Sequence, residues 1–184
     1  MEDKKFRVEA DLLGELNVPV NAYYGVQTQR GINNYQISNA KMSDYPDYVI
    51  AMAYVKLAAV EANHEVGLIN DEITNAIAQA CKEIIDGKWH EDFPVDMVQG
   101  GAGTSVNMNA NEVIANRALE IMGHKRGEYQ YCSPNDHVNC AQSTNDAYPT
   151  AIRLAVVRMN KGLVASLTDL VKDFRKQAEQ FKHN

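Results

Sequence analysis

The chain has 184 residues, of which 45% are apolar and 23% are charged, and its formal net charge is −6. An acidic chain without a basic run is a poor candidate for binding nucleic acid or an anionic membrane surface. No apolar stretch approaches the roughly 18 residues that span a bilayer, the first residues lack a signal-peptide core, and the three cysteines follow no disulfide pattern. We therefore expect a globular, cytoplasmic protein with neither a nucleic-acid nor a membrane partner.

The first half of the chain predicts an irregular start followed by two helices. Residues 1–45 are expected to be irregular or strand-like, because short extended pieces alternate with glycine and proline. A first helix is predicted from Asp47 to a stop at Gly67, and a second between Asn70 and Gly87. One face of the first helix combines apolar residues with a lysine and an asparagine: Val49, Met52, Ala53, Lys56, Ala59, Val60 and Asn63.

A glycine-rich segment, Gly100–Ser105, leads into a third predicted helix over Val106–Met122, and Gly123 is placed to end it. The segment fits neither nucleotide-binding loop, because it has no lysine for a Walker loop and Val106 stands where the dinucleotide fingerprint needs a third glycine. Backbone amides and hydroxyl groups at a helix N-terminus favour a carboxylate ligand. A tight glycine turn in which Ser105 only caps the helix is the alternative, and the motif leaves both open.

The last predicted helix runs from about Asp146 to Lys182. At 1.5 Å per residue its length is about 55 Å, whereas a compact chain of this size has a radius of gyration of about 16 Å. Its apolar residues recur to the end of the chain, and this sequence has too few helices to cover them. We expect a helical bundle that is completed by further C-terminal sequence, by other subunits, or by both.

Four cap-forming residues, Ser143–Asp146, precede this helix, although one N-cap is enough. The hydroxyl groups of Ser143 and Thr144 are able to donate to carboxylate oxygens, and the amide of Asn145 both donates and accepts. Two donor-rich helix N-termini brought together would hold a small dianionic acid. A simple capping role remains the alternative for each residue.

Other candidate sites are weaker. Cys132, His137 and Cys140 lack the paired spacing and the fourth ligand of a zinc site, so no metal site is expected. Arg30 is a candidate carboxylate contact, although a surface arginine is the commoner outcome.

Four strings of the sequence occur together in an order that is specific to one known family: Tyr23–Thr28, Gly100–Glu112, Pro134–Asn139 and Gln142–Asp146. They resemble the N-terminal third of the fumarase/aspartase superfamily, and the resemblance covers essentially the whole chain. Ala102, Ser105 and Thr144 are similar to the ammonia-lyase branch, because class II fumarases tend to carry serine, glutamine and serine at these positions.

The resemblance implies a mainly α fold. Residues 1–142 would form an N-terminal helical domain with a short irregular or β segment. Residues 143–184 would form the first long helix of a central helical bundle, in an enzyme that is a homotetramer. The chain would then be an incomplete N-terminal fragment, inactive alone, because the loop that carries the family's catalytic serine lies later in full-length members. No catalytic residue is assigned within the chain.

For the complete enzyme the resemblance implies reversible elimination of ammonia from L-aspartate to give fumarate, without a cofactor. Thr104, Ser143 and Thr144 would hold the β-carboxylate of the substrate, and Asn145, with help from Thr144, would contact its amino group.

Asn135 and Asp136 match the family's secondary anion site, and the sequence departs from fumarases at Ser133, where they usually carry histidine. Two alternatives to the ammonia-lyase remain. One is a class II fumarase or related lyase, and the other is a non-catalytic helical interaction module whose last helix is the contact face.

Overall fold

The computed structural model describes residues 5–182. Its N-terminal region forms a β-hairpin and a helix. Strands β1 (Phe6–Asp11) and β2 (Gly14–Pro19) pair in antiparallel register, and α1 (Val26–Asn34) follows. The expectation that residues 1–45 are only irregular or strand-like is therefore wrong for α1.

Helix α1 depends on a side chain from a distant part of the sequence. Its N-cap residue is Gly25, which offers no capping side chain. The carboxylate of Glu112 takes over this role and accepts hydrogen bonds from the backbone amides of Gly25, Gln27 and Thr28 at 2.9, 2.8 and 3.0 Å. Because the capping carboxylate lies more than eighty residues away in the sequence, no local pattern predicted this helix.

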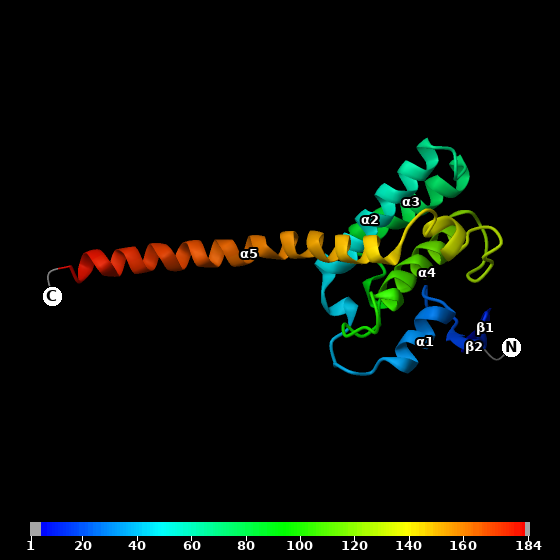
Figure 1. Cartoon of the computed structure of the whole chain (residues 1–184), viewed down its shortest axis with the longest axis horizontal. Helices are drawn as coiled ribbons and strands as arrows, with labels where there is room; N and C mark the ends of the chain where they lie inside the picture. The colour runs from blue at the N-terminus through cyan, green and yellow to red at the C-terminus, as the bar shows by residue number, and fades with distance from the viewer. Residues whose placement is uncertain (1–4, 183–184) are drawn as a thin grey trace.

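Three helices enclose the core: α2 (Pro46–Glu65), α3 (Asp71–Ile85) and α4 (Thr104–Ile121). They lie side by side, with α3 packed on both α2 and α4 (Figure 1). Two single turns, η1 (Met42–Asp44) and η2 (His90–Asp92), lie in the connections. The helices predicted from periodicity are thus confirmed, with bounds shifted by a few residues.

The predicted face of α2 is confirmed at six of its seven positions, and only Ala59 is half-buried. Val49, Met52 and Val60 are buried in the core, as expected for apolar side chains at helical spacing. Lys56 on the same face has no exposed surface at all. A lysine is almost never fully buried unless its charge is paired or hydrogen-bonded, so its partners need an explanation.

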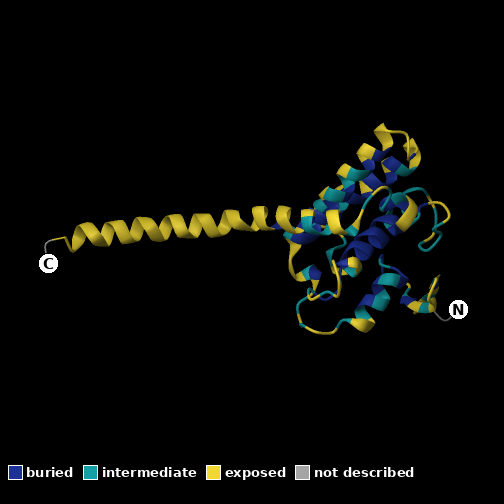
Figure 2. Cartoon of the chain, in the orientation of Figure 1, coloured by how far each residue is buried: buried dark blue, intermediate teal, exposed yellow. Residues whose placement is uncertain are grey.

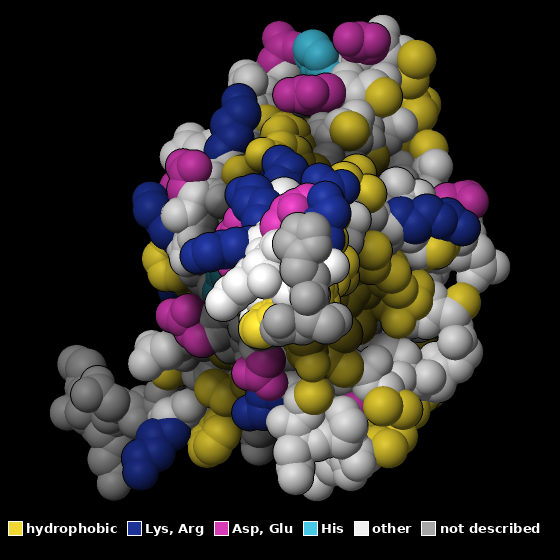
Figure 3. All heavy atoms as spheres, turned by 90° about the vertical axis from the view of Figure 1, so that its left-hand side faces the viewer, with side chains coloured by type: hydrophobic (Ala, Val, Ile, Leu, Met, Phe, Trp, Pro, Cys, Tyr) yellow, Lys and Arg dark blue, Asp and Glu magenta, His cyan; other side chains and the backbone are white. Residues whose placement is uncertain are grey.

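Helix α5 (Thr144–Gln180) has 37 residues, which corresponds to about 55 Å. Ala147, Ala151 and Ala155 near its start are buried where its first turns pack against α2, and the remainder of the helix projects from the domain (Figure 2). Figure 3 looks along this helix and shows basic side chains gathered toward one side of it and hydrophobic ones toward the other. The exposed stripe consists of Val156, Met159, Leu163, Leu167, Leu170 and Phe174. The predicted overlong helix is confirmed.

We expect the chain to self-associate through this stripe, because it exposes apolar side chains that water disfavours. Light scattering over a range of protein concentrations measures the effect. Exchanging Leu163, Leu167 and Leu170 for glutamine should reduce the association. Exchanging Lys161 and Lys176 of the same helix for glutamine should leave it unchanged. A parent chain that remains monomeric at every concentration would contradict the expectation.

No helix within residues 5–182 is both long enough and apolar enough to cross a membrane.

Candidate functional site

The N-termini of α4 and α5 meet across a glycine. Gly103, the N-cap residue of α4, has a φ of 80°, in the left-handed region that favours glycine. A Cβ atom on Gly103 would overlap the ring of Tyr148, which belongs to the first turns of α5. The alternative in which Ser105 caps α4 is wrong, because the helix begins at Thr104 and has no side-chain cap.

A direct hydrogen bond joins the two helix ends. Asn107 on α4 donates from Nδ2 to Oγ1 of Thr144, the first residue of α5, over 3.2 Å. Thr104 lies one turn before Asn107 on α4 and is exposed. The structure thus places Thr104 and Thr144 on neighbouring helix N-termini, where backbone amides and helix dipoles favour an anion.

Ser143 is the N-cap residue of α5. Its Oγ accepts a hydrogen bond from the backbone amide of Asn145 at 3.2 Å, and both residues are exposed. The cap uses a lone pair of the hydroxyl group and leaves its hydrogen available. Capping and substrate binding are therefore compatible roles for Ser143.

Beneath this junction lies the ammonium group of Lys56. Its Nζ donates to three side-chain amide oxygens: Asn107 Oδ1 at 2.8 Å, Asn139 Oδ1 at 3.1 Å and Gln142 Oε1 at 2.9 Å. Three acceptors match the three donors of an ammonium group, which explains how the charge is tolerated inside the core.

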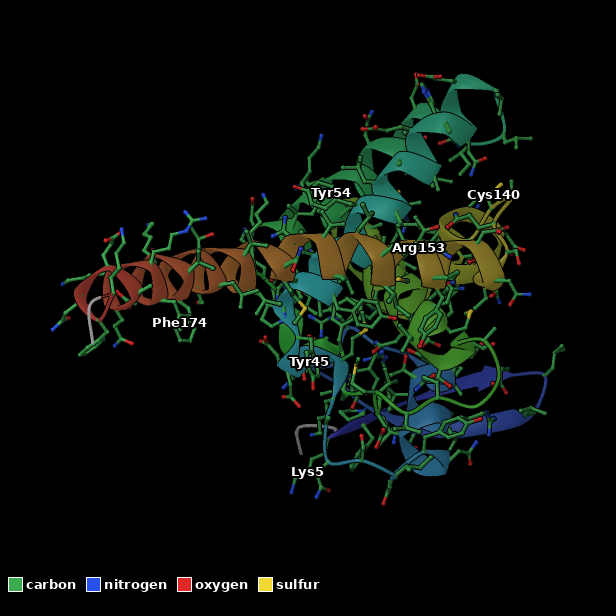
Figure 4. All side chains as sticks on the ribbon, turned by 60° about the vertical axis from the view of Figure 1, so that its left-hand side comes forward. Lys5, Tyr45, Tyr54, Cys140, Arg153 and Phe174 are labelled. Carbon is green, nitrogen blue, oxygen red and sulfur yellow. The ribbon has the colours of Figure 1, made fainter. Side chains whose placement is uncertain are left out.

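The same lysine holds the loop that leads into α5. Gln142, whose Oε1 faces Lys56, donates from Nε2 to the carbonyl oxygens of Val138 and Cys140 at 2.8 and 3.2 Å. Ala141, which lies between Cys140 and Gln142 in the sequence, has a φ of 54°, which is unusual for a residue with a side chain. Figure 4 shows Cys140 in this loop, close to the start of α5. Contacts to one buried charge therefore shape the loop that presents Ser143.

Sequence reasoning did not assign Lys56, Asn107, Asn139 or Gln142 to the site. A signal was present, because Lys56 and Asn63 interrupt the apolar face of α2, and four asparagines of α4 are buried: Asn107, Asn109, Asn111 and Asn116. Polar residues at core positions usually pair with one another. The pattern does not say which ones meet.

Burial of Lys56 has a measurable consequence for the pH dependence of stability. Burial lowers the pKa of Lys56 from 10.5 to about 7. Between these values the unfolded chain keeps a proton that the folded chain has released, so the free energy of unfolding rises by up to about 1.4 kcal/mol per pH unit. Below about pH 7 both states hold the proton, and this rise is absent.

We expect Lys56→Met to lack that rise, because methionine does not titrate. Urea unfolding of the chain and the variant between about pH 6 and pH 10 measures the difference. Lys82→Met on α3 is the matched control, since Lys82 is exposed, and it should keep the slope of the parent. Parallel stability curves for the parent and Lys56→Met would contradict a lowered pKa.

The candidate secondary anion residues lie in η3 (Pro134–Val138), a single π-helical turn. Ser133 caps this turn by accepting from the backbone amides of Asn135 and Asp136, and it donates to the Asp136 carboxylate at 2.9 Å. Asn135 lines an open hollow of about 490 Å³ together with Leu12 and Leu13 of the hairpin turn. Ser133 therefore serves this turn as an N-cap, and Asp136 adds a negative charge beside it.

Arg30 contacts a carboxylate within the chain itself. Its Nε and Nη2 donate to the two oxygens of Asp11 at 2.9 and 2.8 Å, and Nη2 also donates to the carbonyl oxygen of Gly14. The pair fixes the hairpin to α1, and it keeps the pKa of Asp11 below its usual value through the hydrogen bond from Arg30.

Within residues 5–182 no three His, Cys, Asp or Glu side chains lie close enough together to hold a metal ion. Of the weak candidates, Cys132 is buried, and Nδ1 of His137 accepts from the backbone amide of Ser133 at 2.8 Å.

Comparison with known proteins agrees with the motif resemblance. Aspartate ammonia-lyase from Pseudomonas canavaninivorans is 57% identical over 178 residues, and the enzyme of the same name from Escherichia coli strain K12 is 54% identical over 177 residues. These alignments cover 97% and 96% of this chain but 38% and 37% of the relatives. The chain thus spans well under half the length of these curated relatives.

Two solved structures share the fold. The crystal structure of fumarate lyase:delta crystallin from Brucella melitensis matches with a TM-score of 0.92 at 47% identity, covering 95% of this chain and 38% of that one. The class II fumarase of Schistosoma mansoni matches with a TM-score of 0.75 at 38% identity, covering 82% of this chain and 32% of that one. These matches confirm a mainly α fold with a small two-stranded sheet.

The model of the lyase family matches residues 14–183, almost the whole chain. The chain therefore belongs to the lyase family, as its four motifs indicated.

Proposed function

We propose that the chain supplies part of the active site of an aspartate ammonia-lyase, which reversibly eliminates ammonia from L-aspartate to give fumarate. The junction of the two helix N-termini carries this proposal, because Asn107 connects Thr144 to α4 one turn from Thr104. The similarity to curated aspartate ammonia-lyases supports the choice of substrate.

Each residue of the junction has a role in this proposal. Thr104, Ser143 and Thr144 donate hydrogen bonds to the β-carboxylate, and Asn145 contacts the amino group that leaves. Removal of the proton next to the α-carboxylate creates a doubly charged intermediate, and fixed donors stabilise that charge as it develops. The base that removes the proton and the α-carboxylate ligands come from outside this chain, and no cofactor takes part.

We further propose that α5 is the first helix of a central bundle shared in a homotetramer, with the domain boundary between residues 142 and 143. The exposed apolar stripe of α5 supports this assembly. Three free cysteines agree with a reducing cytoplasm.

A chimaera tests the activity. This chain replaces the aligned segment of the Escherichia coli enzyme, to which it is 54% identical. We expect the chimaera to release ammonia and fumarate from L-aspartate, and the chain alone to form no fumarate above background. Fumarate absorbance and an ammonia assay measure both.

The same chimaera separates the alternatives. Preferential dehydration of malate would favour the fumarase, to which the fold similarity is also high. A folded tetramer that acts on neither substrate would favour the non-catalytic interaction module. Turnover of L-aspartate by the isolated chain would overturn the expectation that the missing groups are essential.

A further inference from the structure

The hydroxyl hydrogen of Thr144 has two possible directions, and only one of them serves binding. Pointing outward, it donates to a carboxylate held at the helix junction. Pointing inward, it would donate to an acceptor on α4 and be lost to the substrate, because a hydroxyl group has a single hydrogen. What faces Thr144 from within the protein therefore decides whether it is a donor to substrate.

The group behind the junction carries donors only. Below about pH 7, where the folded chain keeps the proton of Lys56, its ammonium group has three hydrogens and no lone pair, and it is fully buried. Each amide that faces Lys56 must therefore present its oxygen. Asn107 Oδ1 does so at 2.8 Å, which turns the Nδ2 group of Asn107 the other way.

The freed Nδ2 group reaches Thr144. It donates to Asn139 Oδ1 at 3.0 Å and to Thr144 Oγ1 at 3.2 Å. Because Oγ1 receives a hydrogen from the inside, the hydrogen of Thr144 itself has no inward acceptor at Asn107.

We propose that Lys56 is a positioning residue: through the side-chain amide of Asn107, it turns the hydroxyl hydrogen of Thr144 outward, toward the substrate carboxylate. The kinetic consequence rests on the proposed function. The hydrogen-bond arrangement does not, so the two are tested separately.

The variant Asn107→Asp distinguishes this proposal from a structural role. Aspartate has nearly the same shape, and one of its oxygens still accepts from Lys56, so a stabilising contact to the lysine remains. Its second oxygen, however, is an acceptor where asparagine had a donor. Thr144 then donates inward, and the direction of its hydroxyl group is reversed.

We expect Asn107→Asp in the chimaera, assayed below about pH 7 where Lys56 is charged, to fold and assemble but to lower kcat/KM for L-aspartate by about tenfold or more. Lys56→Met should act in the same direction, and Lys82→Met is the surface control. Melting temperatures and light scattering establish that each variant is folded and assembled. A folded Asn107→Asp enzyme within about twofold of the parent would overturn the proposal.

A double-mutant cycle removes the remaining alternative, in which the new negative charge simply repels the substrate. Thr144→Val keeps the shape of the side chain and deletes the hydroxyl group. If the effect passes through Thr144, then adding Asn107→Asp to Thr144→Val changes kcat/KM by no more than about twofold. If Asn107→Asp instead lowers kcat/KM by the same factor in the Thr144→Val enzyme as in the parent, the charge repels the substrate through space, and the proposal is overturned.

The arrangement itself is tested in the isolated chain by NMR, whatever its activity. The two Nδ2 hydrogens of Asn107 should exchange slowly with solvent in the parent and in Lys82→Met, and quickly in Lys56→Met. Fast exchange in the parent would overturn the proposal. Slow exchange together with an inactive parent chimaera would instead reject the proposed function and leave the arrangement standing.

Discussion

Replacing Thr144 with alanine in the chimaera is expected to lower kcat/KM for L-aspartate by about tenfold or more, because one hydrogen bond to a charged carboxylate is lost. Stability should change little, since Ser143 and not Thr144 provides the side-chain cap of α5. Initial rates over a range of aspartate concentrations, beside a melting curve, separate the two effects.

Thr144→Ser is the matched control, because serine keeps the hydroxyl group and removes only a methyl group. It should retain most of the activity. Unchanged kinetics in Thr144→Ala would show that Thr144 does not bind the substrate. Its hydroxyl group would then serve only as the acceptor for Asn107.

Exchange of Gly103 for alanine is expected to have the largest effect on the geometry of the site. The new methyl group would overlap the ring of Tyr148 and push the N-termini of α4 and α5 apart. Overpacking of this kind costs about 1–3 kcal/mol, and the left-handed backbone adds about 1 kcal/mol. We expect a clear loss of stability in urea, and in the chimaera a loss of activity that exceeds the loss of folded protein.

Gly101→Ala provides the comparison. Gly101 also has a positive φ, 65°, but nothing lies within 4 Å of its added Cβ atom. Gly101→Ala should therefore lower the free energy of unfolding only through its left-handed backbone, without a steric overlap. Equal destabilisation by the two substitutions would show that the close approach of α4 and α5 at Gly103 is not tight.

The helices of the core could be read from the sequence because their signals are local. The apolar spacing from Val49 to Asn63 marked the buried face of α2, and Asn70 caps α3 with its own side chain, accepting from the amide of Ile73 at 3.0 Å. Such signals depend on residues within one or two turns of one another.

Helix α1 escaped the same reasoning because its N-terminus is stabilised from another part of the chain. The carboxylate of Glu112 supplies the cap that Gly25 lacks, and Thr28 adds a hydroxyl hydrogen bond to it at 2.6 Å. Burial raises the pKa of Glu112, and the hydrogen bonds from α1 oppose that rise. A glutamate within a helical pattern gives no sign of its distant partner.

The candidate site also contains residues that local sequence signals indicated and residues that they did not. Residue types alone indicated Thr104, Ser143, Thr144 and Asn145, since hydroxyl and amide groups at helix N-termini are suited to a carboxylate. We propose that they bind the substrate, and the kinetics of Thr144→Ala test this assignment.

Local sequence patterns were enough to predict the core helices within a few residues, a last helix that extends beyond its domain, and membership of the lyase family. Local patterns did not show what lies behind the helix junction, which is a fully buried lysine that donates to three side-chain amides, one of which, Asn107, contacts Thr144. The reason is physical. Periodicity reports which face of a helix is buried, but the direction of a hydrogen bond depends on the donors and acceptors that meet there, and these come from separate parts of the chain.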